Sequence, residues 1–167
     1  MSIVIRPTEA ELHLAASVGV LRTIFAVRNN LKRGKNNHED AGSADNVTGA
    51  IGEMMVAKHL DYFWSGTIGT VKAVADVGPC FQVRATDHPH GKLIAYPEDN
   101  DRQPYILARV LLPDVHLVGW LWGAEAKQKQ FWRTDVRSPA FFAWPVHDMD
   151  ELPSEAAVAL AQQKVVA

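Results

Sequence analysis

The feature that most constrains the fold is the apolar run Ile106 to Leu112, which has the sequence ILARVLL. It has the length of a strand, and Arg109 alone interrupts it. A strand that is exposed on one face alternates apolar with polar residues, whereas a strand covered on both faces is almost continuously apolar. We therefore expect a central strand over 105–112 that lies between two layers of structure.

Other segments supply the rest of the sheet and its cover. Runs with strand character are separated by short turns rich in glycine, proline and aspartate, and these turns suit an antiparallel meander. The runs are 71–77, 80–86, 93–96 and 115–122. A long helix over 9–31, which Thr8 caps, and a second helix from about Thr48 to Leu60 can cover the central strand.

The length favours a single domain over 1–167, because 167 residues of which 47% are hydrophobic can bury one core. We expect a core at about 48–132, a flexible surface loop at 34–46 and a C-terminal helix at 153–164. A short helix near 124–130 and an irregular aromatic segment precede that last helix. The expected fold class is α/β (α+β), with a central mixed sheet of about five strands flanked by helices.

The charge balance excludes attraction of nucleic acid by overall charge. Seventeen Lys and Arg against nineteen Asp and Glu give a net charge of −2. A polyanion would need a local patch, and the best candidate gathers at the end of the first helix and in the loop beyond it. Its members are Arg22, Arg28, Lys32, Arg33 and Lys35. The alternative is a solvated helix end whose cations complement the helix dipole.

The cysteine content and the N-terminal segment bear on the compartment. Cys80 is the single cysteine, so the chain cannot form an intramolecular disulfide. The N-terminal segment lacks a basic region followed by an apolar core, and no apolar run approaches the roughly 18 residues of a membrane span. We therefore expect a cytoplasmic protein with no membrane partner.

Glu53 lies in the sequence GAIGEMMVAKHL, which is apolar on nearly every side of a helix. A helix that is apolar all round is a buried helix. A carboxylate there loses several kcal/mol of hydration and needs a cation, strong hydrogen bonds or a proton. Small residues on both sides leave room for a compensating group to approach Glu53, and the alternative is an ion pair with a core arginine such as Arg109.

Two further polar motifs follow Glu53 along the chain. Asp76 ends the small apolar run of AVADVG before a Gly-Pro turn, so it should lie at a strand end. In CFQVRAT, Gln82 and Arg84 share one face of the next strand, and a tight hairpin brings Asp76 beside them. Taken separately, Asp76 is a turn residue, and the other two form the exposed polar face of an edge strand.

In this order, the three motifs resemble those of the PD-(D/E)XK nuclease superfamily. The sequences GAIGE, ADVG and QVRAT are most similar to its small phage-associated nuclease-like members. The resemblance covers roughly 48–132 and implies a restriction-endonuclease-like core. It also implies hydrolysis of phosphodiester bonds in nucleic acid, DNA rather than RNA, with Mg²⁺ or Mn²⁺ as the cofactor.

The resemblance implies a role for each site residue. Glu53, Asp76 and Gln82 would be side-chain metal ligands, Val83 a backbone ligand, and Arg84 a neighbour of the attacking water and the scissile phosphate. Two departures from the family pattern bear on activity. Gln82 stands where an acid is more common, which removes one negative charge. Arg84 stands where lysine is usual, and a guanidinium can clamp a phosphate but cannot accept a proton.

Gln128 and Trp132 stand four residues apart and would share one face of the short helix, where some relatives hold substrate. The alternative is a surface glutamine beside a core tryptophan.

Two other function classes stay open. The departures at Gln82 and Arg84 fit a nuclease-like fold that no longer cuts and instead binds nucleic acid or inhibits a protein. The aromatic segment 131–144 fits a structural protein that uses it as a contact in a homodimer or other oligomer.

Overall fold

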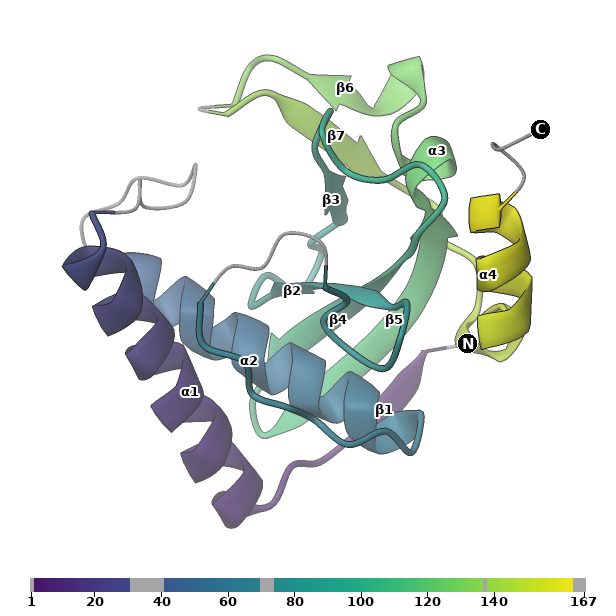
Figure 1. The fold of residues 1–167 in the computed structure, drawn as a ribbon. Helices are drawn as coiled ribbons and strands as arrows, with labels where there is room; N and C mark the ends of the chain where they lie inside the picture. The colour runs from purple at the N-terminus through teal and green to yellow at the C-terminus, as the bar shows by residue number, and fades with distance from the viewer. Residues whose placement is uncertain (1, 31–40, 70–73, 137, 164–167) are drawn as a thin grey trace.

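The computed structural model of the chain describes residues 2–30, 41–69, 74–136 and 138–163. Its elements are β1 (Ile3–Ile5), α1 (Glu9–Arg28), α2 (Ala41–His59), β2 (Gln82–Thr86), β3 (Leu93–Ala95), β4 (Pro104–Leu111), β5 (Asp114–Trp122), α3 (Gly123–Ala126), β6 (Trp132–Arg133), β7 (Ala140–Ala143) and α4 (Glu155–Gln163). Figure 1 shows a central sheet with α2 across one face and a second, smaller sheet at the other end of the molecule. The mixed α+β class expected from the sequence is confirmed.

The central sheet has four strands in the order β1-β5-β4-β2. β4 and β5 form an antiparallel hairpin, and β1, which the sequence analysis missed, adds antiparallel to the edge of β5. β2 runs parallel to β4, with Val83 opposite Ile106. The expected antiparallel meander is therefore wrong, because the chain between β2 and β4 crosses over instead of turning back.

Two expected strands do not join this sheet. β3 leaves it and pairs with β7, which in turn pairs with β6, so the segment expected to be irregular supplies two strands of the smaller sheet. In the expected strand 71–77, the described residues contribute one bridge, between Val77 and Phe81. Positions 74–76 are described and are not part of a strand, while 71–73 lie outside the described residues.

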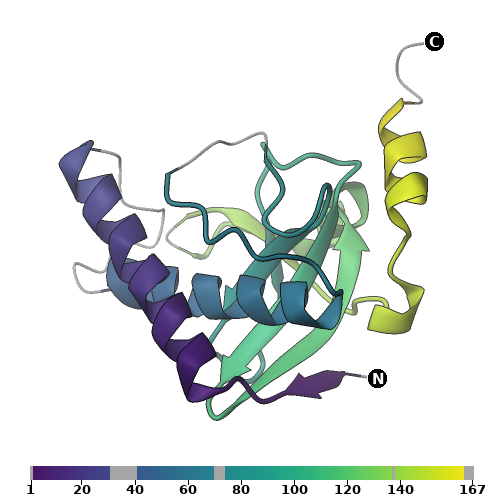
Figure 2. The same ribbon diagram turned by 60° about the horizontal axis from the view of Figure 1, so that its bottom comes forward.

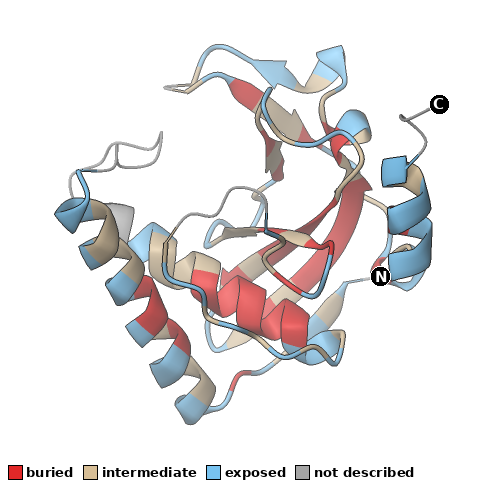
Figure 3. Cartoon of the chain, in the orientation of Figure 1, coloured by how far each residue is buried: buried red, intermediate tan, exposed pale blue. Residues whose placement is uncertain are grey.

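β4 is covered on both faces, as its sequence predicts. Ile106, Ala108 and Val110 belong to the larger core, which includes the buried residues of α2. Tyr105 and Leu107 belong to a second core, together with residues of β3 and β7. The sequence predicts that two helices cover β4. Instead, α1 packs mainly on α2, and the smaller sheet covers the second face of β4. Figure 3 shows the buried residues concentrated on α2 and the central strands.

α1 begins where the sequence predicts. The Thr8 hydroxyl accepts a hydrogen bond from the Glu11 amide (3.2 Å), and the Glu11 carboxylate accepts one from the Thr8 amide (2.7 Å), which together form a capping box. Ala15, Val18 and Gly19 are its buried residues. Judged by length and composition alone, α1 is long and apolar enough to cross a membrane.

α2 begins at Ala41, so the expected loop 34–46 is helical in its last part; positions 34–40 lie outside the described residues. Packing against α1 accounts for the difference. The Asn46 side-chain amide donates to the Thr23 hydroxyl of α1 (2.9 Å), in a region that has little helix propensity of its own.

The C-terminal part also departs from the expected elements. The helix expected at 124–130 ends at Ala126, and a separate turn of 3-10 helix follows. α4 falls within the expected range 153–164. It is anchored by the buried Val158 and by a hydrogen bond from the Tyr62 hydroxyl to Glu155. Figures 1 and 2 both place α4 on the side of the molecule opposite α1.

Candidate active site

Two glycines let α1, α2 and β2 approach one another closely. A Cβ atom at Gly19 would lie 2.5 Å from the Val47 Cα of α2, and a Cβ atom at Gly52 would lie 2.7 Å from the Ala85 Cβ of β2. Both distances are shorter than a van der Waals contact, so neither position has room for a side chain. This close stacking places Glu53, the neighbour of Gly52, between α1 and the sheet.

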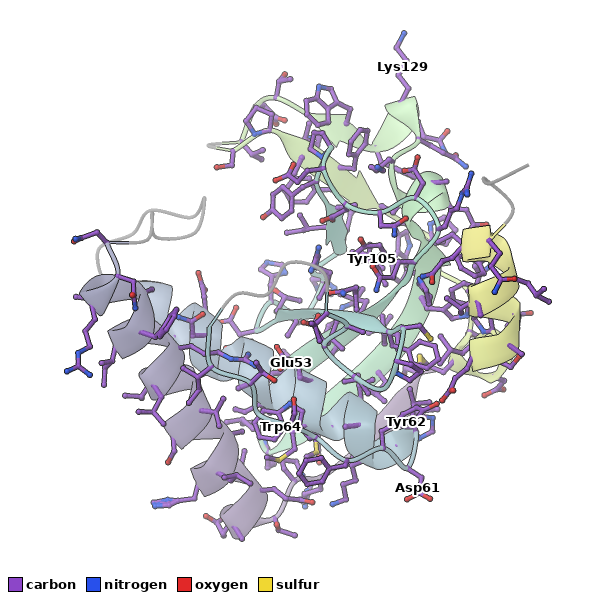
Figure 4. The ribbon with its side chains drawn as sticks, viewed as in Figure 1. Glu53, Asp61, Tyr62, Trp64, Tyr105 and Lys129 are labelled. Atoms are coloured by element: carbon purple, nitrogen blue, oxygen red, sulfur yellow. The ribbon has the colours of Figure 1, made fainter. Side chains whose placement is uncertain are left out.

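Glu53 is buried, with 9% of its surface exposed, and Arg22 of α1 binds both of its carboxylate oxygens. The distances are 2.7 Å from Nη1 to Oε1 and 2.7 Å from Nη2 to Oε2, which is a bidentate pair. The Trp64 indole nitrogen lies 3.3 Å from Oε2, and Figure 4 shows Trp64 beside Glu53. Glu53 therefore has an arginine partner, but it is not Arg109, which donates to the Gly91 carbonyl.

Arg22 is the functional residue whose role the sequence analysis missed, because it was assigned to a solvent-facing basic patch. Arg22 follows Val18 by four residues and Ala15 by seven, so it lies on the buried face of α1. Its Nε also donates to the Thr67 carbonyl (3.0 Å). That helical spacing is visible in the sequence and could have separated Arg22 from the exposed Arg28.

Asp76 lies beside β2, as the hairpin in the sequence predicts. Its Oδ2 accepts a hydrogen bond from the Val83 amide (2.8 Å). Burial, and then the negative charge of Glu53, raise the pKa of Asp76 from 3.8 to about 6, against the opposing effects of the Val83 amide and of two arginines. The charge of Glu53 thus acts on Asp76, although the two carboxylates come from different elements.

The backbone of Val83 faces Asp76 at the edge of β2. β2 is an edge strand of the sheet, with β4 on one side only. The N–H and C=O groups of one residue in a strand point to the same side. Because the Val83 N–H points to Asp76 instead of β4, its carbonyl oxygen also points to the open edge. This edge therefore presents a carboxylate and a backbone carbonyl together.

Gln82 and Arg84, the other two residues of the strand motif, have protein partners. The Gln82 amide nitrogen donates to the Val74 carbonyl (3.3 Å), which leaves the amide oxygen as its potential metal ligand. Arg84 donates to Asp99 (2.8 Å) and to the Ile94 carbonyl (3.1 Å). Arg84 thus ties β2 to β3, and it acts on Asp76 through its charge, which lowers the pKa of that carboxyl.

Of the expected substrate-binding residues, the structure describes Arg28 and Gln128. Arg28 is exposed in the last turn of α1, while 32, 33 and 35 lie outside the described residues. Gln128 is exposed in extended backbone between α3 and the 3-10 turn, and its side chain accepts a hydrogen bond from Gln130. It cannot share a helix face with Trp132, which belongs to β6. That expectation was wrong because the Lys127 ammonium binds carbonyls of the 97–99 turn where the helix ends.

The donor chemistry fits a hard divalent cation better than a soft one. Across the described ranges, no group of three or more His, Cys, Asp or Glu side chains is arranged to hold a metal ion. The oxygen donors at the β2 edge are the Asp76 carboxylate and the Val83 carbonyl, with the Gln82 amide on the preceding residue of the strand and the Glu53 carboxylate on α2. Mg²⁺ and Mn²⁺ prefer such oxygen donors. Asp76 suits this role best, since Glu53 already shares its charge with Arg22.

The fold and site together define an α+β protein in which Asp76 lies at the edge of β2 and the Arg22–Glu53 ion pair joins α1 to α2. Comparisons with protein-family models, with curated proteins and with solved structures found no match.

Proposed function

We propose that this protein is a nuclease that hydrolyses phosphodiester bonds, in DNA rather than RNA, with Mg²⁺ or Mn²⁺ as its cofactor. The observation that carries the proposal is the place of Asp76 at the edge of β2, where its carboxylate accepts a hydrogen bond from the Val83 amide, and where burial and the negative charge of Glu53 raise its pKa. A divalent cation would stabilise a buried carboxylate that experiences a second negative charge. The order of the three motifs supports nucleic acid as the substrate.

We assign each residue the role that the motif resemblance implies, adjusted to its contacts. Asp76, the Val83 carbonyl and the Gln82 amide oxygen would hold the cation, with Glu53 next to them. When bound, the cation supplies an activated water and neutralises negative charge on the phosphate. Arg22 holds Glu53 in one orientation through its two hydrogen bonds.

The contacts of Arg84 differ from those that its implied role next to the scissile phosphate would require. Its guanidinium is engaged by Asp99 and by the Ile94 carbonyl, so in this arrangement it raises the positive potential at the site without facing the β2 edge. A direct contact with phosphate would require Arg84 to release Asp99.

The test is a cleavage assay on labelled single-stranded, duplex and branched DNA, with a matching RNA series, in Mg²⁺ or Mn²⁺. We expect cleavage that chelator abolishes, with DNA cut faster than RNA. Asp76→Asn should lower the rate by at least about 100-fold, as removal of a metal-binding group does. Asp61→Asn is the matched control, because it removes one carboxylate from an exposed turn (Figure 4) and should leave the rate unchanged. A folded protein that cuts none of these substrates would overturn the proposal.

A second candidate is a nuclease-like fold that binds nucleic acid or a protein without cutting. The observation that favours it is that both arginines near the site are already paired, Arg22 with Glu53 and Arg84 with Asp99. Calorimetry with Mn²⁺ separates the two functions. Binding at millimolar or lower concentration that Asp76→Asn abolishes favours the nuclease, and no binding favours the second candidate.

A further inference from the structure

A cavity of about 460 Å³ lies on the face of the central sheet opposite α2. Arg109 and Leu111 line it, and they alternate along β4 with Ala108 and Val110, which face the α2 side. Other lining residues are His116, Val118, Trp144 and Asp148. The cavity is therefore separate from the carboxylate pair at the β2 edge, and its volume falls in the range of about 300 to 1,000 Å³ that small ligands occupy.

Arg109 is a half-buried cation that has no carboxylate partner among the described residues. Its Nε and Nη2 both donate to the Gly91 carbonyl, at 3.0 and 2.8 Å, which leaves Nη1 for another acceptor. Burial lowers the pKa of Arg109. A partly desolvated guanidinium with an N–H group left over suits an anionic ligand.

His116 adds a second polar group at the same place. It lies directly opposite Arg109 in the β4–β5 register, so the two side chains project from the same face of the sheet into the cavity lining. A guanidinium with an imidazole beside it supplies several nitrogen donors that suit phosphate oxygens.

Trp144 provides a planar wall. The Arg109 guanidinium carbon lies 5.2 Å from the Trp144 ring centroid, and the residue keeps 42% of its surface exposed. An aromatic ring that is held by a cation and still open to solvent is a stacking platform for another planar ring.

We propose that this cavity binds a small ligand with one anionic group and a planar ring, of which a nucleoside monophosphate is the simplest example. The phosphate would contact Arg109 and His116, and the base would stack on Trp144. The ligand would be a free nucleotide or the terminal nucleotide of a strand, which share this chemistry.

The test is calorimetry of the full chain with AMP, adenosine, inorganic phosphate and a 5′-phosphorylated trinucleotide. We expect AMP to bind at least about tenfold more tightly than adenosine or phosphate, because both halves of the ligand are recognised. Tighter binding of the trinucleotide than of AMP would assign the site to strand ends, and the reverse would assign it to free nucleotides. Absence of binding by both phosphorylated ligands would overturn the proposal.

Two variants address the two halves of the cavity. Arg109→Gln and Trp144→Leu should each weaken AMP binding by about tenfold or more. Trp144→Leu changes a partly exposed side chain, so it tests the cavity even if Arg109→Gln lowers the stability of the fold. Lys129→Gln removes an exposed cation elsewhere (Figure 4) and should change nothing. Asp76→Asn should also leave AMP binding intact, which separates this site from the proposed metal site. Unchanged AMP binding in Trp144→Leu would overturn the proposal.

Discussion

Arg22 of α1 and Glu53 of α2 form a bidentate ion pair across the helix interface, with two nitrogen-oxygen distances of 2.7 Å. The side chains of the pair keep 21% and 11% of their surface exposed, so water screens the pair weakly. The pair therefore joins the two helices at the same residue that contributes a carboxylate to the candidate site.

The first prediction concerns this pair. Arg22→Gln leaves Glu53 buried without a cation, and we expect a loss of about 3 kcal/mol in the free energy of unfolding at pH 7. Adding Glu53→Gln should recover much of that loss, because the unpaired charge is gone. Arg28→Gln, on the exposed face of the same helix, should change stability by less than about 0.5 kcal/mol. Urea unfolding measures all four proteins, and equal losses in the single and double variants would contradict the interpretation.

The second prediction concerns the dependence of stability on pH. The pKa of Asp76 is raised in the folded state, from 3.8 to about 6, so the native state binds this proton more tightly than the unfolded state does. The charged carboxylate therefore costs stability above about pH 6, and this cost disappears as the pH falls below the unfolded value. Asp76→Asn keeps an acceptor for the Val83 amide and should stabilise the protein by about 2 kcal/mol at pH 8.

The same substitution should have little effect near pH 3.5, because Asp76 is then protonated in the folded state and mostly protonated in the unfolded state. Urea unfolding between pH 3.5 and 8 gives the comparison. Asp61→Asn serves as the control, and its effect should not show this dependence on pH. A stability gain in Asp76→Asn that is independent of pH would mean that desolvation of the charge is not the cause.

The third prediction concerns the cation. A metal-binding carboxylate must lose its proton, so Mn²⁺ affinity should rise between pH 5 and pH 7.5 as Asp76 ionises. Binding at pH 5.5 should release a fraction of a proton, which calorimetry in buffers of different ionisation enthalpy detects. Asp76→Asn should remove both the affinity and the proton release. Mn²⁺ affinity that is constant over this range would place the cation elsewhere.

The fourth prediction concerns the spacing between α2 and β2. A Cβ atom at Gly52 would lie 2.7 Å from the Ala85 Cβ, so Gly52→Ala should push the helix from the strand and cost about 1 to 3 kcal/mol. Adding Ala85→Gly should restore part of that loss. Gly49→Ala is the matched control on the same helix, because no atom lies within 4 Å of the added Cβ. It should stabilise the protein by up to about 1 kcal/mol through helix propensity, and thermal unfolding measures the difference.

The sequence by itself determined the features that depend on neighbouring residues. The capping box at Thr8 and Glu11 uses residues three positions apart, and it sets the start of α1. The apolar run in β4 required cover on both faces, whatever supplied it. The short turn after Asp76 likewise placed that carboxylate beside β2, because so few residues separate the two.

Only the tertiary structure decided the pairings between distant segments. β2 lies parallel to β4, Glu53 pairs with Arg22 thirty-one positions away, and Arg84 pairs with Asp99 in the turn after β3. A buried carboxylate needs a compensating cation, but the residues next to it in the sequence do not indicate which cation will pair with it. That choice depends on how closely Gly19 and Gly52 let the helices and the sheet approach. The distance between these helices and the sheet depends on contacts between segments far apart in the sequence, so it is decided only in the folded structure.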